Sequence, residues 1–104
     1  MISQDRLEKS MAYLATTDEE AAELLTEVER REYKAKAVRD TIFLHEAGTV
    51  AERTAKAGAS QEYMDAMAGY FESVAAFHAV KNKRNTETLV IDVWRSLNAN
   101  RRQG

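Results

Sequence analysis

Residues 18–46 read DEEAAELLTEVERREYKAKAVRDTIFLHE, and this stretch decides the fold because it predicts one long helix. It contains neither proline nor glycine, and apolar side chains recur along it at helical spacing. These side chains are Leu24, Leu25, Val28, Ala35, Val38 and Ile42, with Phe43 beside them. Charge interrupts the apolar row at Arg31 and Glu32. A helix of this length measures about 43 Å, so it must bury its apolar row against another long helix.

The composition extends the helical prediction to the whole chain. The 104 residues include no proline, no cysteine and four glycines, a composition typical of helical proteins. The length fits a single helical domain over residues 1–104. Without cysteine, neither disulfides nor thiolate chemistry are expected. No apolar run is long enough for a membrane span, and the first residues do not resemble a signal peptide.

A separate short helix is predicted ahead of the long one, over residues 4–15. Ser3 can cap its N-terminus through the side-chain hydroxyl. Thr16 and Thr17 are expected to end this helix. Thr17 then opens the long helix by forming a capping box with Glu20.

A second short helix is predicted in the connection that follows, over residues 50–56. Gly48 suits a left-handed cap at the end of the long helix. Thr49 and Glu52 form a capping box that begins the short helix, and Gly58 ends it.

The last predicted helix runs from residue 61 to about residue 98. A polar octet at residues 81–88 interrupts its apolar face but contains no helix breaker. A break at the octet, with Asn85 or Thr86 as a new N-cap, is the alternative. Residues 98–104 are predicted to form a frayed basic tail.

The apolar face before the octet consists of Met64, Met67, Phe71, Val74 and Phe77, which we interpret as core, with an adaptable binding groove as the alternative.

These elements predict an all-α fold. It is an antiparallel, coiled-coil-like hairpin of two long helices, with a short N-terminal helix alongside and a short helix in the connecting turn. One thin hairpin cannot cover helices of this length. We therefore expect a homodimer, formed through the long helices or the segment around Trp94.

Charge is distributed unevenly along the chain. Residues 81–104 carry a net charge of +4, whereas residues 1–80 carry a net charge of −6. The candidate binding residues are the basic side chains of this last segment and its tryptophan: Lys81, Lys83, Arg84, Trp94, Arg95, Arg101 and Arg102. On one helix, Lys81, Arg84 and Arg95 fall near one face, where they can follow a phosphate backbone. Trp94 can stack on an unpaired base, which favours single-stranded DNA.

Other interpretations of this segment stay open. The basic residues also suit an acidic protein partner or an ordinary solvated surface, and Trp94 also suits a core position. Conversely, the acidic side chains on the long helix can imitate DNA phosphates toward a host protein complex. That alternative acidic face consists of Asp18, Glu19, Glu23 and Glu27.

Enzymatic chemistry is not predicted. His45 and His78 lie far apart in the sequence and lack the spacing of metal ligands, so no metal site and no cofactor are expected. The many carboxylates lie on a solvated helix rather than in a cleft that would shift their pKa values. The sequence also lacks a glycine-rich phosphate loop.

Two segments, GTVAER at residues 48–53 and LVIDVWRSLNANRR at residues 89–102, resemble a family of small helical proteins from the early region of tailed bacteriophages. The resemblance implies a cytoplasmic protein of an infected bacterium, encoded near recombination and single-strand-binding functions, and supplies no catalytic residues. We therefore expect a non-enzymatic accessory protein for DNA recombination or replication, which contacts DNA or a DNA-bound protein. The alternatives are an inhibitor or adaptor acting on a host defence or nuclease complex, and a structural oligomer.

Overall fold

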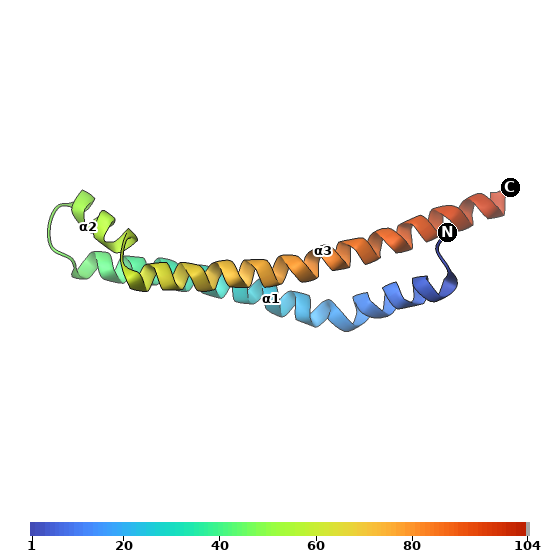
Figure 1. Cartoon of the computed structure of the whole chain (residues 1–104), viewed down its shortest axis with the longest axis horizontal. Helices are drawn as coiled ribbons and strands as arrows, with labels where there is room; N and C mark the ends of the chain where they lie inside the picture. Colours follow the sequence, from blue (N-terminus) through green and yellow to red (C-terminus); the bar gives the residue numbers. More distant parts are fainter. Residues whose placement is uncertain (104) are drawn as a thin grey trace. The chain divides into compact units, whose positions relative to one another are not determined.

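The computed structural model describes residues 1–103, with side chains through Arg101, and its regular secondary structure is α-helical (Figure 1). The described residues form three helices, α1 (Gln4–His45), α2 (Val50–Gly58) and α3 (Gln61–Gln103). The all-α prediction is therefore confirmed. Within the described part, each helix is too short or too polar to cross a membrane.

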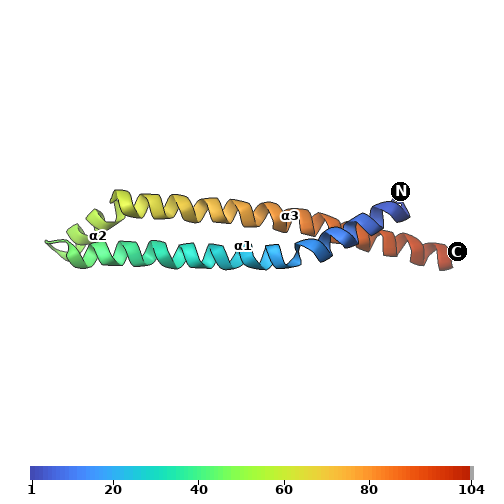
Figure 2. The ribbon, with the colours of Figure 1, turned by 90° about the horizontal axis from the view of Figure 1, so that it is seen from below.

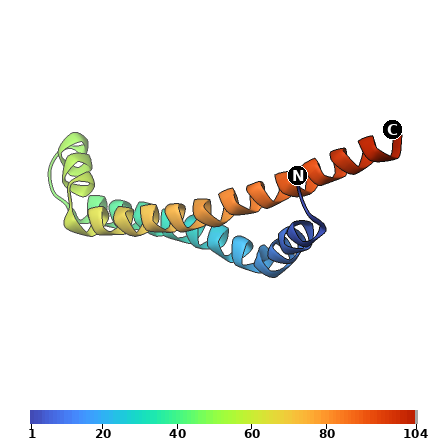
Figure 3. The ribbon, with the colours of Figure 1, turned by 45° about the vertical axis from the view of Figure 1, so that its right-hand side comes forward.

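The chain divides into two compact units. Unit 1 combines Met1–Ala22 with the residues from His78 onward, and unit 2 is Glu23–Phe77. In each unit a segment of α1 packs against a segment of α3 that runs in the opposite direction (Figure 2). The prediction that the two long helices pack as an antiparallel pair is confirmed. Both ends of the described chain belong to unit 1 (Figure 3).

The predicted helix boundary at Thr16 and Thr17 is wrong, because α1 is continuous from Gln4. Both threonine hydroxyls donate to the carbonyl of Tyr13, at 3.2 Å from Thr16 and 2.7 Å from Thr17. The hydroxyls thus bond back within the helix and do not cap a new one. The separate N-terminal helix and the capping box between Thr17 and Glu20 therefore do not exist.

A seven-residue repeat explains why α1 has no break. Its members are half-buried or buried and alternate at spacings of three and four: Leu7, Ser10, Leu14, Thr17, Ala21, Leu24, Val28, Arg31, Ala35, Val38 and Ile42. We call these residues the α1 seam. The repeat is that of a coiled coil. Polar residues occupy several seam positions, which is why a search for apolar residues alone found only part of it.

The α3 seam has the same spacing and passes through the polar octet. Its members are Tyr63, Ala66, Tyr70, Ser73, Phe77, Val80, Arg84, Glu87, Ile91, Trp94 and Asn98. The continuous last helix is confirmed, and the alternative break at Asn85 or Thr86 is wrong. The helix also continues to Gln103, so the predicted tail is helical over residues 98–103. Gly104 lies outside the described residues.

The predicted cap at Thr49 is confirmed, because the backbone N–H of Glu52 donates to Thr49 Oγ1 at 3.2 Å. Gly48 adopts a positive φ of 117°, but it lies three residues after α1 ends at His45. α2 extends to Gly58, two residues past its predicted end. Arg53 holds α2 against the end of α1, because its Nε donates to the carbonyl of Phe43 at 3.1 Å and its guanidinium lies 4.2 Å from the Phe43 ring centroid.

The hydrophobic core is thin. Leu7, Ala35 and Ala57 are the apolar side chains that are buried among the described residues. Each unit is built on a pair of helices, and a helix in a pair keeps much of its circumference in solvent. Large apolar side chains are consequently exposed on the outer faces, and these faces are where partners can bind.

Candidate partner-binding surfaces

A buried polar layer fixes the pairing of α1 and α3 in unit 1. Arg6 donates to the Glu87 carboxylate from Nη1 at 2.7 Å and from Nη2 at 3.0 Å. Ser10 Oγ donates to the same carboxylate at 2.7 Å. Glu87 is 8 % exposed. The hydrogen bonds from Arg6 and Ser10 lower the pKa of Glu87 below its ordinary range, against a smaller opposing effect of burial. Sequence reasoning counted Glu87 only as a minor acid in a basic segment.

Arg84, one of the predicted binding residues, belongs to a second polar layer in unit 1. Its Nη1 donates to the carbonyl of Leu14 at 2.8 Å and to Thr17 Oγ1 at 2.7 Å. Its Nη2 lies 3.2 Å from Asp18 Oδ1, and its side chain is 22 % exposed. Arg84 therefore faces α1 and serves the fold, instead of belonging to an outward basic row.

The other predicted cations are on the surface, but helical spacing places Lys81 and Arg95 on one side of α3 and Lys83 and Arg101 on another. Lys83 Nζ lies 4.5 Å from the centroid of the Tyr13 ring. Arg95 is exposed and makes no hydrogen bond or ion pair with another described residue, and Arg101 Nη2 donates to Met1 Sδ at 3.4 Å. Lys81 is exposed as well. The side chain of Arg102 lies outside the described residues.

Trp94 is half-buried and lies on the α3 seam, one heptad after Glu87. The seam faces α1, so this position matches the core interpretation of Trp94 better than an open stacking platform. Glu87 and Trp94 together show that the seam changes from charged to aromatic within two helical turns.

An apolar row lies on the surface of unit 1. Leu89, Val93 and Leu97 are 61, 40 and 40 % exposed. Their spacing of four residues places them along one side of α3. We call these three residues the docking lane. The signal was present in the sequence, because residues 89–97 are apolar on more sides than one neighbouring helix can cover.

The predicted acidic face is partly occupied by the chain itself. Asp18 binds Arg84, and Glu27 binds both Arg30 and Arg31. The hydrogen bond from Arg31 is the main reason that the pKa of Glu27 is lowered. The remaining two members, Glu19 and Glu23, are exposed. Asp18 and Glu19 belong to unit 1, whereas Glu23 and Glu27 belong to unit 2.

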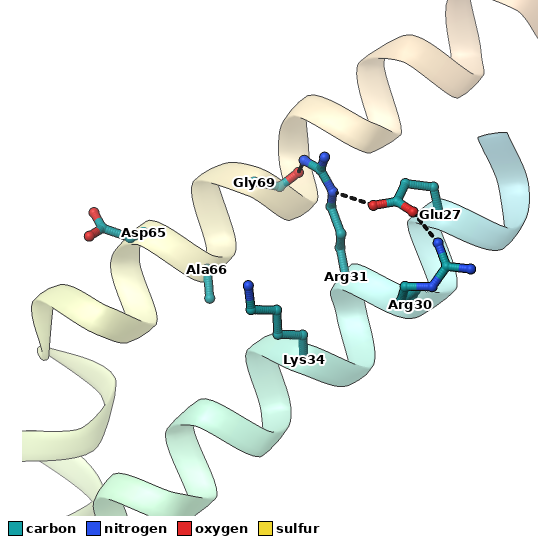
Figure 4. A pocket seen from close by; sticks show the side chains of 7 residues that line it. All are labelled: Glu27, Arg30, Arg31, Lys34, Asp65, Ala66 and Gly69. Atoms are coloured by element: carbon teal, nitrogen blue, oxygen red, sulfur yellow. Dashed lines mark hydrogen bonds and ion pairs between the residues drawn. The ribbon is translucent and has the colours of Figure 1, made fainter.

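A basic groove of about 320 Å³ accompanies Glu27 in unit 2. It is lined by Glu27, Arg30, Arg31, Lys34, Asp65, Ala66 and Gly69 (Figure 4). Arg31 spans the groove, because its Nε donates to Glu27 at 2.7 Å and its Nη1 donates to the carbonyl of Gly69 at 2.8 Å. The hydrogen bond to Gly69 joins α1 to α3. The described residues contain no group of three potential metal-binding His, Cys, Asp or Glu side chains.

Comparison with protein-family models, curated proteins and solved structures finds no match to the chain. The phage-family resemblance therefore stays a prediction.

Proposed function

We propose that the protein is a non-enzymatic accessory protein that binds an amphipathic helix of a partner protein along the docking lane. The observation that supports this proposal is the alignment of Leu89, Val93 and Leu97, which are at least 40 % exposed, on one side of a helix. A row of apolar side chains at helical spacing is the recognition surface of helix-to-helix binding. An exposed row of this kind is otherwise unfavourable in water.

The charges near the docking lane favour a partner helix with acidic flanks. Arg101 is exposed and lies four residues after Leu97, so it continues the same side of α3, and it binds no described carboxylate. Asp or Glu residues beside the apolar row of the partner would complement it. In such an interface the apolar burial supplies most of the affinity, while the rim charges raise the association rate and select the partner.

The same arrangement suits the role that the phage-family resemblance implies. An accessory protein of recombination or replication can act by holding a DNA-bound protein through such a helix. An inhibitor of a host complex can use the same surface. The proposal is thus a class of partner and a mode of binding.

The test begins by finding the partner through a photo-crosslinking residue at Val93, with the same residue at Tyr33 as a control. The captured protein is then purified, and its affinity is measured for Leu89→Lys/Leu97→Lys. We expect affinity to fall at least about tenfold. Tyr33→Lys, at a 76 % exposed aromatic in unit 2, leaves affinity unchanged. An unaltered affinity in the Leu89→Lys/Leu97→Lys variant contradicts the proposal.

DNA is the second candidate, and one observation favours it. Lys81, Thr88 and Arg95 are exposed at seven-residue spacing, so they form one line beside the α3 seam. Binding to labelled single-stranded and double-stranded DNA over a salt series tests this candidate. Affinity should fall steeply with salt and weaken in Lys81→Ala/Arg95→Ala. Arg84→Ala is a poor probe, because Arg84 bonds to α1. Binding that is insensitive to Lys81 and Arg95 counts against DNA.

A further inference from the structure

A second exposed apolar row lies on α3 in unit 2, on the side of the helix that the seam does not use. Its members are Met64, Ala68, Phe71 and Ala75, at spacings of four, three and four. Met64 is 52 % exposed and Phe71 is 59 % exposed, and both alanines are exposed. We call these four residues the self lane. Its spacing is that of a coiled-coil seam, yet nothing in unit 2 covers it.

The self lane is complementary to itself when read in the opposite direction. Its side chains run large, small, large, small. If a second α3 packs antiparallel about a two-fold axis between Gly69 and Tyr70, Met64 faces Ala75 of the copy and Ala68 faces Phe71 of the copy. Each large side chain then meets an alanine, and every contact occurs twice, as a two-fold interface requires. A parallel arrangement would place Phe71 against Phe71 and leave the alanines facing each other.

The accessible surface of the chain leaves room for such an interface. The chain exposes 7475 Å², whereas a folded monomer of this mass exposes about 5,900 Å². A stable interface removes about 800 Å² from each partner. The excess surface is therefore larger than one interface of ordinary size needs.

The residues beside the self lane set its salt dependence. Met67 and Val74 are half-buried on one flank and widen the apolar surface. Asp65 and Glu72 lie on the other flank, where an antiparallel copy brings the same acids nearby. Arg31 Nη1 lies 3.9 Å from Glu72 and offsets part of that repulsion. Association should consequently strengthen with added salt, opposite to binding of DNA.

We infer that α3 is a self-association helix whose self lane binds a second copy of this chain in antiparallel orientation. The inference does not depend on the docking lane, because the self lane lies in unit 2 and the docking lane lies in unit 1. The protein would act as a dimer that carries two docking lanes.

Sedimentation equilibrium of the full chain tests the association. Phe71→Glu should weaken dimerisation about thirtyfold, because it buries a charge opposite Ala68. Tyr33→Glu is the matched control, since Tyr33 is 76 % exposed on α1 away from the self lane, and it should leave dimerisation unchanged. Circular dichroism checks that both variants stay helical. A monomeric wild-type chain, or equal dimerisation of wild type and Phe71→Glu, overturns the inference.

Disulfide crosslinking tests the orientation of the two copies. The chain contains no cysteine, so an introduced cysteine is the one thiol in each variant. Met64→Cys and Ala75→Cys variants are oxidised separately and as a mixture. The antiparallel register predicts a disulfide between the two variants in the mixture, and little crosslinking in either variant alone, because equal positions lie about 16 Å apart along the helix. Crosslinking of Met64→Cys to itself overturns the inference. This test also decides the case in which Phe71→Glu fails to fold.

The two proposals fail in different ways. If Leu89→Lys/Leu97→Lys abolishes dimerisation and Phe71→Glu does not, the docking lane is the homodimer interface and the inference is wrong. If Phe71→Glu alone produces monomers that still bind the purified partner, the inference holds and the docking lane is a separate site.

Discussion

Units 1 and 2 use the same heptad spacing but hold their helices together by different chemistry. In unit 1, Arg6 and Ser10 bind the buried Glu87 in the middle of the seam. In unit 2, most seam side chains are apolar, such as Ala35 and Val38, and the charged member Arg31 hydrogen-bonds to a backbone carbonyl of α3. A charged pair adds less to stability than its contacts suggest, but it penalises every wrong pairing. The spacing thus makes the helices pair, and the seam chemistry determines how specifically they do so.

The largest effect on this comparison is expected from Leu7→Ala, which removes the buried leucine of unit 1. Truncation of this buried side chain should lower the free energy of unfolding by about 2–5 kcal/mol. Trp94 lies in unit 1, so its fluorescence in urea follows that unit. Leu44→Ala is the control, because Leu44 is 71 % exposed. A Trp94 transition that is the same in Leu7→Ala and wild type would show that Leu7 does not anchor the unit.

A smaller loss is expected from Ala35→Leu in unit 2. Ala35 is 2 % exposed, so the longer side chain has to push α1 and α3 apart, at a cost of about 1–3 kcal/mol. Hydrogen exchange should show the loss in amides of unit 2. Ala37→Leu, at an exposed position on the same helix, provides the control. If both leucine variants exchange at the same rate, the spacing of the helices in unit 2 is not set by Ala35.

The third prediction is an acid dependence that belongs to unit 1. The pKa of Glu87 is lower in the folded chain, so its contribution to stability is present above the unfolded pKa of about 4.3. That contribution is lost as the pH falls from there through the lowered native pKa. Glu87→Gln should therefore destabilise unit 1 at neutral pH and flatten its loss of stability in acid, as measured by Trp94 fluorescence.

Glu27→Gln gives the matching experiment in unit 2. The pKa of Glu27 is also lowered, but the residue is distant in sequence from the reporter and lies in the other unit. Its substitution should leave the acid transition of Trp94 nearly unchanged and alter hydrogen exchange in unit 2. An equal effect of both substitutions on Trp94 would mean that the two units unfold together.

The sequence was sufficient for the class of fold but not for its internal boundaries. The absence of proline and the caps at Ser3 and Thr49 predicted helices that the structure contains. The helix boundary predicted at Thr17 was wrong, because a hydroxyl that can cap a helix can equally donate to the carbonyl four residues before it. The polar octet was interpreted as an interruption of the apolar face, but Arg84 and Glu87 occupy seam positions where only apolar residues were expected.

The candidate site was less predictable, because the net charge of a segment does not show to which side of the helix each charged side chain points. Arg84 and Arg95 contribute equally to the net charge of the C-terminal segment, yet one faces α1 and the other is exposed. The side of α3 to which a residue points depends on its position in the seven-residue repeat. That repeat can be recognised in the sequence only when polar residues are counted as possible seam members. Leu89 shows the same point for apolar residues, since it lies in an apolar stretch and is nevertheless 61 % exposed.

The contact of Arg53 with Phe43 controls one of the two sites at which trypsin can open the turn after α1. The connecting residues 46–49 contain no lysine or arginine, so trypsin must cut within α2, at Arg53 or Lys56. Arg53 is held by the carbonyl and ring of Phe43. Cleavage there requires α2 to detach first. The rate of tryptic nicking at Arg53 therefore measures how often this short helix leaves its place while the long helices stay paired.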